Sequence, residues 1–488
     1  MNLLDPVGMA VIAGYLVTLA AIAIASRRAR LDNSMDDFYL GGRSLGTLVL
    51  FLTLYATQYS GLTLIGFAGA AYRSGFTFLV SITFGCSIIG GYLLLAPRLR
   101  ALSERHHFIT IGDYLQHRYR SRALTIGATL LFIFALGAYV LSNLKAAGYV
   151  LQAASGGRLP MAHGIIGLSL LIVLYESLGG LRAVAWTDVM QGTILALGCG
   201  LAFATIVDHY GFVSSMETLA HRRPDFFSLP SAGAQAGWLS TVVLVMFGVS
   251  IYPHAIQRIY AARSRRTLRL SLQLMLLMPF LTTLPMIAVG YIGAAYYPDL
   301  SRTESEQIVF HVLGELSRQT PHLRPLVVLL VCALIAAIMS TVDSALLAIS
   351  ALVTRDIYGR LRPELDSQTL TRSGKRFSWA LMVALAGLSI TLPQTLWRIT
   401  ELKLEVLIQL APGIFLGLYL RQIQSRDVAR GLVTGCALTG VLMLTAALGL
   451  LPDKPAGLHP GLLGALLNLT VILLSNRANG RAVRGTHR

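Results

Sequence analysis

Long apolar runs separated by short polar stretches dominate the pattern of this chain. A helix needs about 20 mostly apolar residues in a row to cross the hydrocarbon core of a bilayer. Thirteen segments meet this requirement, so the pattern predicts an all-α polytopic membrane protein with about 13 transmembrane helices. The predicted helices cover residues 6–26, 46–72, 74–97, 123–150, 159–178, 183–207, 234–257, 270–296, 325–354, 377–397, 404–420, 431–452 and 457–476.

The composition supports a membrane protein. Hydrophobic residues make up 55% of the 488 residues and charged residues only 13%, which is about half the charged share of soluble domains. The four cysteines all lie within apolar runs and are predicted to be small buried hydrophobic residues rather than disulfide partners. No stretch between the predicted helices resembles an independent soluble domain.

The formal net charge of +17 indicates an orientation in the membrane. If the N-terminus lies outside and the helices alternate in direction, about three quarters of the Lys and Arg residues fall on the inner side. Arg27 and Arg28 follow the first apolar segment and Asp5 precedes it, the reverse of a signal peptide. We therefore expect the N-terminus outside and the C-terminus inside. A nucleic-acid partner is disfavoured, because no soluble domain is available to present a basic surface.

Polar residues gather in the middle of segment 325–354. Asp343 lies there together with Ser340, Thr341 and Ser344. Hydroxyl and carboxylate oxygens are hard ligands that suit a small hard cation, so these residues are candidates for an ion site. The hydroxyls could instead bond to the preceding helical turn or to a neighbouring helix.

Two predicted helices are interrupted by polar residues together with glycine or proline. Segment 46–72 contains the run 55–61, and segment 234–257 contains Gly248 and Pro253. A break in a membrane helix frees backbone carbonyls, which an ion can satisfy. Each interrupted segment opens a set of five helices, and an odd number of helices makes the two sets inverted repeats. The predicted divisions are a first helix and loop at 1–45, the first repeat at 46–208, an external loop at 209–233, the second repeat at 234–421, and two peripheral helices with a basic tail at 422–488.

Four motifs resemble the sodium:solute symporter family across nearly the whole chain. The resemblance implies a leucine-transporter-like fold of two inverted five-helix repeats. It also implies inward movement of sodium coupled to the uptake of a small solute. The motifs are residues 37–46 before the first core helix, 179–191 at the start of the fifth, 253–258 at the end of the sixth, and 339–344 with 355–358 in the eighth.

The resemblance also implies a set of sodium ligands. In the family, the main sodium site takes carbonyl oxygens from the first and eighth core helices and two hydroxyls from the eighth. The matching positions of this chain are the carbonyls of Ala56, Tyr59 and Ala337 and the hydroxyls of Ser340 and Thr341. This set agrees with the hard oxygen ligands inferred above.

Some members of the family have a second ion site, and Asp188, Ser340 and Ser344 match its positions. The possible second site of this chain is therefore Asp188 and Ser344 together with the adjacent Asp343. Asp343 stands where those members have a hydroxyl. Asp343 could instead neutralise Lys145, which lies in the middle of segment 123–150, or bind a proton.

Several positions bear on the solute. Gln58 stands where proline-transporting members have an Asp, and Val245 and Val249 stand where they have Trp and Tyr, which argues against proline. The runs 144–148 and 252–254 resemble the branches that transport carboxylates, pantothenate and amino acids, so we expect a small solute that bears a carboxylate. The candidate lining residues are Gln58, Ser60, Thr63, Tyr139, Asn143, Phe247 and Tyr252.

These features predict a secondary active symporter in the plasma (inner) membrane, with sodium as the coupling ion and the solute and the lipid bilayer as partners. No obligate protein partner is expected. Alternatives are a proton-coupled transporter that uses Asp188 or Asp343, a channel, and a transporter-derived solute sensor, although the chain ends in a short basic tail instead of a signalling domain. An enzyme is not expected, because the sequence has no phosphate loop, nucleophile elbow or metal-ligand His/Cys spacing.

Overall fold

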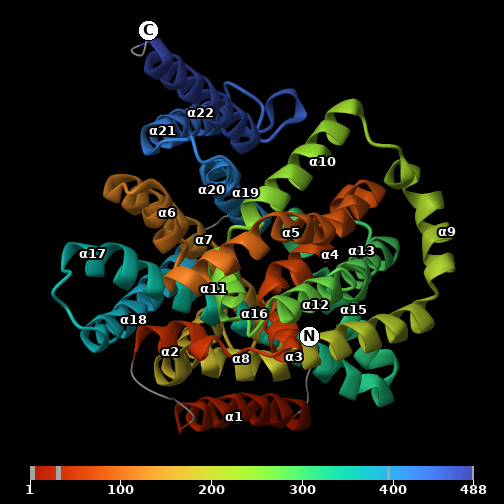
Figure 1. Ribbon diagram of the computed structural model, residues 1–488. Helices are drawn as coiled ribbons and strands as arrows, with labels where there is room; N and C mark the ends of the chain where they lie inside the picture. The colour runs from red at the N-terminus through yellow and green to blue at the C-terminus, as the bar shows by residue number, and fades with distance from the viewer. Residues whose placement is uncertain (1–5, 29–33, 393–395, 486–488) are drawn as a thin grey trace.

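The computed structural model is a bundle of helices (Figure 1). It describes residues 6–28, 34–392 and 396–485. The α-helices are α1 (Pro6–Arg28), α2 (Met35–Leu40), α3 (Thr47–Gln58), α4 (Phe67–Ser74), α5 (Ser81–His106), α6 (Ile111–Tyr119), α7 (Arg122–Ala154), α8 (Met161–Tyr210), α9 (Phe212–Arg222), α10 (Ala232–Leu244), α11 (Pro253–Ala261), α12 (Arg265–Met275), α13 (Leu284–Tyr296), α14 (Arg302–Ser305), α15 (Ile308–Gln319), α16 (Arg324–Ala351), α17 (Gly359–Leu361), α18 (Ser367–Thr391), α19 (Leu396–Leu407), α20 (Ala411–Tyr419), α21 (Ser425–Ala447) and α22 (Pro460–Gly485). Four π-helical segments interrupt or extend them: η2 (Leu62–Gly66), η5 (Val245–Val249), η6 (Pro279–Thr283) and η8 (Leu352–Tyr358).

The centre of the bundle is α16. Every residue from Leu330 to Leu352 is buried, as expected for a helix that is apolar on all sides and surrounded by other helices. Helices α3, α7 and α8 pack against it. The polar residues in the middle of α16 therefore lie in the interior of the protein rather than against lipid.

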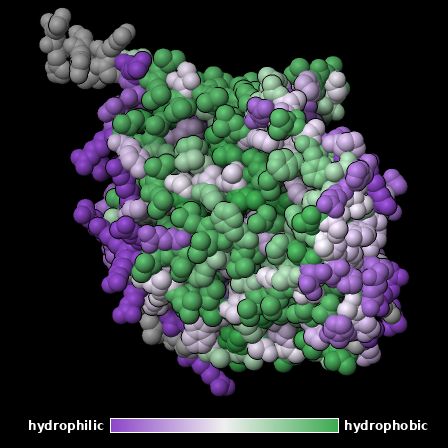
Figure 2. All heavy atoms as spheres, turned by 90° about the vertical axis from the view of Figure 1, so that its right-hand side faces the viewer, coloured by the Kyte–Doolittle hydropathy of each residue, from purple (hydrophilic) through white to green (hydrophobic). Residues whose placement is uncertain are grey.

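The two ends of the chain form the margins of the bundle. Helix α1 lies along one edge against α8, and the paired helices α21 and α22 lie at the opposite edge (Figure 1). A broad apolar surface separates two hydrophilic margins in the side view (Figure 2). This is the surface expected of a protein that crosses a bilayer with its polar ends in water.

Ten helices among the described residues are long and apolar enough to cross a membrane. This number is three lower than the 13 transmembrane helices expected from the sequence, for three reasons. Helix α3 is apolar but has only 12 residues. Helix α8 contains two of the expected spans. Helix α18 is not among the ten, and the end of its expected span, 377–397, runs over residues 393–395, which lie outside the described part of the chain.

Gly180 divides α8 into two parts. A straight helix of 50 residues would be about 75 Å long, more than twice the thickness of a bilayer core. Gly180 has non-helical dihedral angles (φ 59°, ψ −151°), and a Cβ atom there would lie 2.3 Å from the carbonyl oxygen of Phe38. Only glycine fits this backbone conformation at such a close approach. The break falls between the expected spans 159–178 and 183–207.

Candidate functional site

The first element of the site is the break after α3. The helix ends at Gln58, Tyr59 is extended (φ −97°, ψ 104°), and the chain resumes through η2 and α4. Gly61 lies inside the break, where a Cβ atom would be 2.7 Å from Ile338 and 2.9 Å from Ala146. The absence of a side chain thus allows the broken segment to touch both α16 and α7.

Hydroxyl groups of α16 donate hydrogen bonds to carbonyl groups at the end of α3. The Ser340 Oγ atom is 2.8 Å from the carbonyl oxygen of Ala56 and 3.2 Å from that of Ala337. One residue along each helix, the Thr341 hydroxyl donates to the carbonyl of Thr57 at 3.4 Å. The structure thus brings together Ala56, Ala337 and Ser340, with Thr341 beside them.

Tyr59 and Asn143 have different roles at the break. Tyr59 turns its side chain into the lining of a cavity described below. Asn143 accepts a hydrogen bond from the Gly61 amide at 3.0 Å and donates to the Tyr139 carbonyl at 2.9 Å. Asn143 therefore holds the broken segment against α7, and it is not among the residues that line the cavity.

A second polar cluster surrounds Arg258 of α11. Its guanidinium is completely buried and forms an ion pair with Asp188 at 2.9 Å. It also donates to the hydroxyls of Ser344 at 2.5 Å and Thr53 at 2.8 Å, and Thr53 in turn donates to Asp188. Asp188 and Ser344, both predicted to bind a second ion, thus meet around a positive charge that the chain itself supplies.

Asp343 has other neighbours. Its carboxylate accepts hydrogen bonds from Tyr175 at 2.5 Å and from Ser344 at 3.1 Å. Lys145 donates to the Leu392 carbonyl at 2.8 Å instead. The suggested ion pair between Asp343 and Lys145 was therefore wrong, because packing directs Lys145 toward the end of α18.

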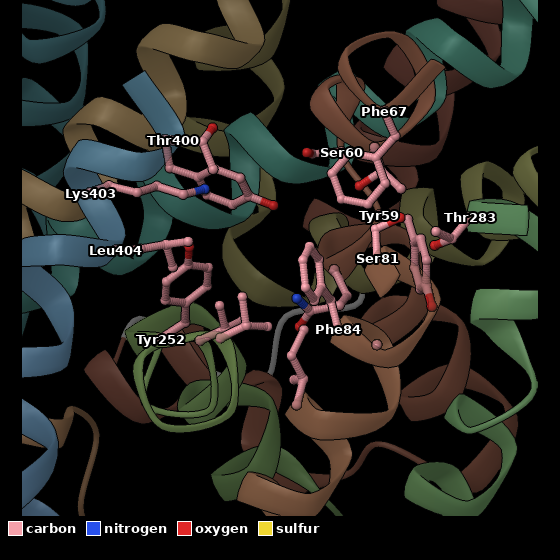
Figure 3. Close-up of a pocket in the computed structure, with 17 residues that line it drawn as sticks. Tyr59, Ser60, Phe67, Ser81, Phe84, Tyr252, Thr283, Thr400, Lys403 and Leu404 are labelled. Atoms are coloured by element: carbon pink, nitrogen blue, oxygen red, sulfur yellow. The ribbon is translucent and has the colours of Figure 1, made fainter. Parts of the chain in front are cut away.

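The third element is a cavity of about 90 Å³ beside the break (Figure 3). Five of the seven predicted solute residues line it: Gln58, Ser60, Thr63, Tyr139 and Tyr252. Phe247 lies elsewhere. Its ring packs against Phe415 at 5.2 Å between centroids, and it lines a separate apolar hollow beside α20 and α22.

A larger hollow of about 510 Å³ adjoins the cavity. Phe84 lines both, and the rest of the wall of the hollow comes from α4, η3 (Gly75–Val80), α10, the connection between α21 and α22, Arg302 and Glu401. Phe84 thus lies at the border between the cavity and this hollow.

Lys403 also lines the cavity and was not among the predicted residues. The sequence pattern placed it outside a span, because Glu401, Lys403 and Glu405 lower the local hydropathy and the predicted helix began at 404. In the structure, α19 begins at Leu396 and Lys403 lies about two turns into it. The run of charged residues at the start of an apolar segment is the sequence feature that could have indicated Lys403 as a site residue.

A bundle with an apolar outer surface and polar residues gathered around a cavity is the arrangement expected of a polytopic membrane transporter. The chain belongs to the sodium:solute symporter family, whose model matches residues 38–435. This confirms the family resemblance that the sequence motifs indicated.

Curated relatives match almost the full length of the chain. It is 28% identical over 477 residues to the sodium/pantothenate symporter of Escherichia coli, covering 95% of each chain. It is 25% identical over 489 residues to the osmoregulated proline transporter OpuE of Bacillus subtilis, covering 96% of this chain and 95% of that protein.

Solved structures share the fold. A Na⁺-coupled sialic acid symporter, solved in a substrate-bound outward-open state, superposes with a TM-score of 0.80 at 19% identity, covering 97% of this chain and 98% of the other. Mhp1, a nucleobase-cation-symport-1 family transporter, gives 0.55 at 16% identity, covering 92% and 95%. These superpositions support the expected leucine-transporter-like fold.

Proposed function

We propose that the protein imports a small organic solute together with sodium by alternating access. The observation that carries this proposal is the contact of the Ser340 hydroxyl with the Ala56 and Ala337 carbonyls where α3 breaks. Three oxygens within hydrogen-bonding distance, in the interior of a membrane protein, form a site that a dehydrated hard cation can enter. A sodium ion at this place would be coordinated by all three oxygens, and this coordination would replace the hydrogen bonds of the Ser340 hydroxyl.

The proposed sodium ligands are the carbonyls of Ala56, Tyr59 and Ala337 and the hydroxyls of Ser340 and Thr341. A second ion at Asp188, Asp343 and Ser344 would have to share two of these residues with Arg258, whose guanidinium already balances the Asp188 charge. The second site is thus proposed only for states in which Arg258 moves.

The proposed solute site is the cavity beside the break. Gln58, Ser60, Thr63, Tyr139 and Tyr252 would contact a solute that bears a carboxylate, such as a monocarboxylate, pantothenate or an amino acid. The pantothenate symporter among the relatives supports this class. Asn143 would act indirectly through the break, and Phe247 would contact the solute only after a rearrangement of η5.

The proposed arrangement in the membrane has 13 spans in the plasma (inner) membrane, with the N-terminus outside and the C-terminus inside. Helices α3 and α4, separated by a break, would open one five-helix repeat. Helices α10 and α11, separated by η5 and residues 250–252, would open the inverted second repeat. In this orientation the hollow beyond Phe84 faces outward and is the entrance for sodium and solute.

Transport requires that sodium favour the state that binds the solute, and by linkage the solute then favours sodium. The Thr57 carbonyl joins the two sites, because it accepts hydrogen bonds from Thr341 at 3.4 Å and from Tyr139 at 3.3 Å. An inward membrane potential would add about 2.3 kcal/mol per charge per 100 mV.

Uptake into proteoliposomes tests the proposal. Radiolabelled pantothenate, lactate and alanine would be offered with an inward sodium gradient, and with choline replacing sodium at fixed pH. We expect uptake of at least one of these compounds only with sodium. Uptake that continues in choline and follows an imposed proton gradient would instead support proton coupling.

Replacing Tyr139 by Phe tests the connection between the sites. The ring remains, but the hydrogen bond to the Thr57 carbonyl is lost. A net contribution of about 1 kcal/mol for such a bond predicts that the sodium-induced gain in solute affinity falls about fivefold. The dissociation constant of the solute would be measured with and without sodium. Tyr149→Phe, on the same helix but with no hydrogen bond from its hydroxyl to the described residues of the break, is the control and should leave the gain unchanged.

A further inference from the structure

Lys403 places an ammonium group inside the proposed solute cavity. The side chain is only 3% exposed and extends from α19 into the cavity, on the side opposite Ser60 and Phe84 (Figure 3). Its Nζ atom lies 3.3 Å from the centre of the Tyr139 ring and 5.4 Å from that of Tyr252. These distances are typical of cation–π contacts, which hold a cation without using its hydrogen-bond donors.

No carboxylate of the described residues balances this charge. The cavity lining contains no acidic residue. The two glutamates nearest in sequence are directed elsewhere: Glu401 forms an ion pair with Lys454 at 3.1 Å, and Glu405 with His459 at 2.7 Å. No hydrogen bond or ion pair of Lys403 with another described residue is found. A buried ammonium is costly unless an anion accompanies it, so the site is electrostatically incomplete without one.

The remaining lining combines uncharged polar groups with apolar side chains. Amide and hydroxyl groups come from Gln58, Ser60, Thr63, Thr283 and Thr400, and the apolar part from Phe67, Phe84, Ile88, Val245, Val249 and Leu404. The first group can bind hydroxyl or amide groups of a solute, and the second a short hydrocarbon portion. An additional positive charge on the solute would lie beside Lys403 with no acidic group to receive it.

We propose that Lys403 binds the carboxylate of the solute, and that the cavity therefore selects anionic carboxylates over zwitterionic amino acids and neutral analogues. This inference rests on the proposed function and narrows its solute class. Lys403 is then the residue that determines specificity, with Tyr139 and Tyr252 fixing the position of its ammonium group.

Matched compounds test the selection without any mutation. Binding to the purified full-length protein in sodium would be compared for L-lactate, its neutral amide lactamide, and L-alanine, in which an ammonium replaces the hydroxyl. Pantothenate and its neutral alcohol panthenol form a second, larger pair. We expect at least one acid to bind at least tenfold more tightly than its neutral partner, and lactate to bind more tightly than alanine. Preference for alanine or for a neutral compound, or binding of none of the acids, overturns the inference.

Two variants test the residue. Lys403→Met should weaken binding of the preferred acid by at least a hundredfold and leave its neutral analogue nearly unchanged, whereas Lys403→Arg should retain part of the affinity for the acid. Lys375→Met is the matched control, since that ammonium also lies over an aromatic ring, 4.8 Å from the Phe38 centroid, but outside the cavity. Unchanged affinity for the acid in Lys403→Met overturns the inference.

A measurement of sodium binding in the absence of solute distinguishes a failure of this inference from a failure of the proposed function. It would be measured with radioactive sodium for the wild type and each variant, and intact binding in Lys403→Met also shows that this variant is folded. Wild-type protein that fails to bind sodium contradicts the proposed function. Sodium binding together with no preference for acids contradicts only the role of Lys403. If Lys403→Met does not fold, the comparison of matched compounds on the wild type decides.

Discussion

Replacing Ser340 and Thr341 together by alanine should raise the sodium concentration for half-maximal uptake about a hundredfold, with each single change giving about tenfold. The hydroxyls of these residues contact the carbonyls of Ala56, Ala337 and Thr57. Alanine removes the two hydroxyl ligands and leaves only carbonyl oxygens for the ion. Uptake in proteoliposomes over a series of sodium concentrations, at constant ionic strength, measures the change.

Ser350→Ala is the matched control for this experiment. Ser350 is also a buried hydroxyl residue of α16, but it bonds to Tyr39 at 3.0 Å and not to the end of α3. Its loss should leave the sodium dependence unchanged. If Ser340→Ala and Thr341→Ala also leave it unchanged while the wild type requires sodium, the proposed ligand set is incorrect.

Arg258→Met should destabilise the protein by about 3–5 kcal/mol, because removing one partner leaves Asp188 as an uncompensated buried charge. Both side chains are completely buried, and the guanidinium also bonds to Thr53 and Ser344. The measurement is thermal unfolding of the purified protein, with the population of folded protein followed by size-exclusion chromatography.

Asp188→Asn combined with Arg258→Met should recover much of the lost stability, because both buried charges of the ion pair are then removed. Sodium adds a second readout. If a second ion can bind at Asp188 and Ser344, sodium should stabilise Arg258→Met more than it stabilises the wild type, because the ion can take the place of the guanidinium. Equal stabilisation by sodium in both proteins argues against a second site there.

The candidate site could be predicted where a residue differed sharply from its surroundings. Ser340 and Thr341 stand out because they are hydroxyl residues in a largely apolar helix, and Gln58 and Ser60 because they interrupt another. Such residues are costly against lipid, so their position alone indicates the interior. Phe247 gave no such signal, because an aromatic residue in a span is equally compatible with lipid, with helix packing and with a cavity.

The two missed cations show where this reasoning fails. Arg258 and Lys403 each lie one residue beyond the end of a predicted span, so the hydropathy pattern assigns them to the aqueous loops. A hydropathy pattern averages over neighbours and cannot tell a charge at the surface from one that points inward. Helix α11 turns Arg258 toward Asp188, and the early start of α19 carries Lys403 into the cavity.

The sequence by itself determined that the chain is a helical membrane protein, which family it belongs to, and which helices are broken, because these properties depend on local composition and on motifs of fixed spacing. Only the tertiary structure decided which polar groups meet. Asp188, Arg258 and Ser344 come from three helices far apart in the chain, and Lys403 and Tyr139 from two others. Their contacts depend on how helices pack and in which direction each side chain points, which no periodicity along one segment encodes.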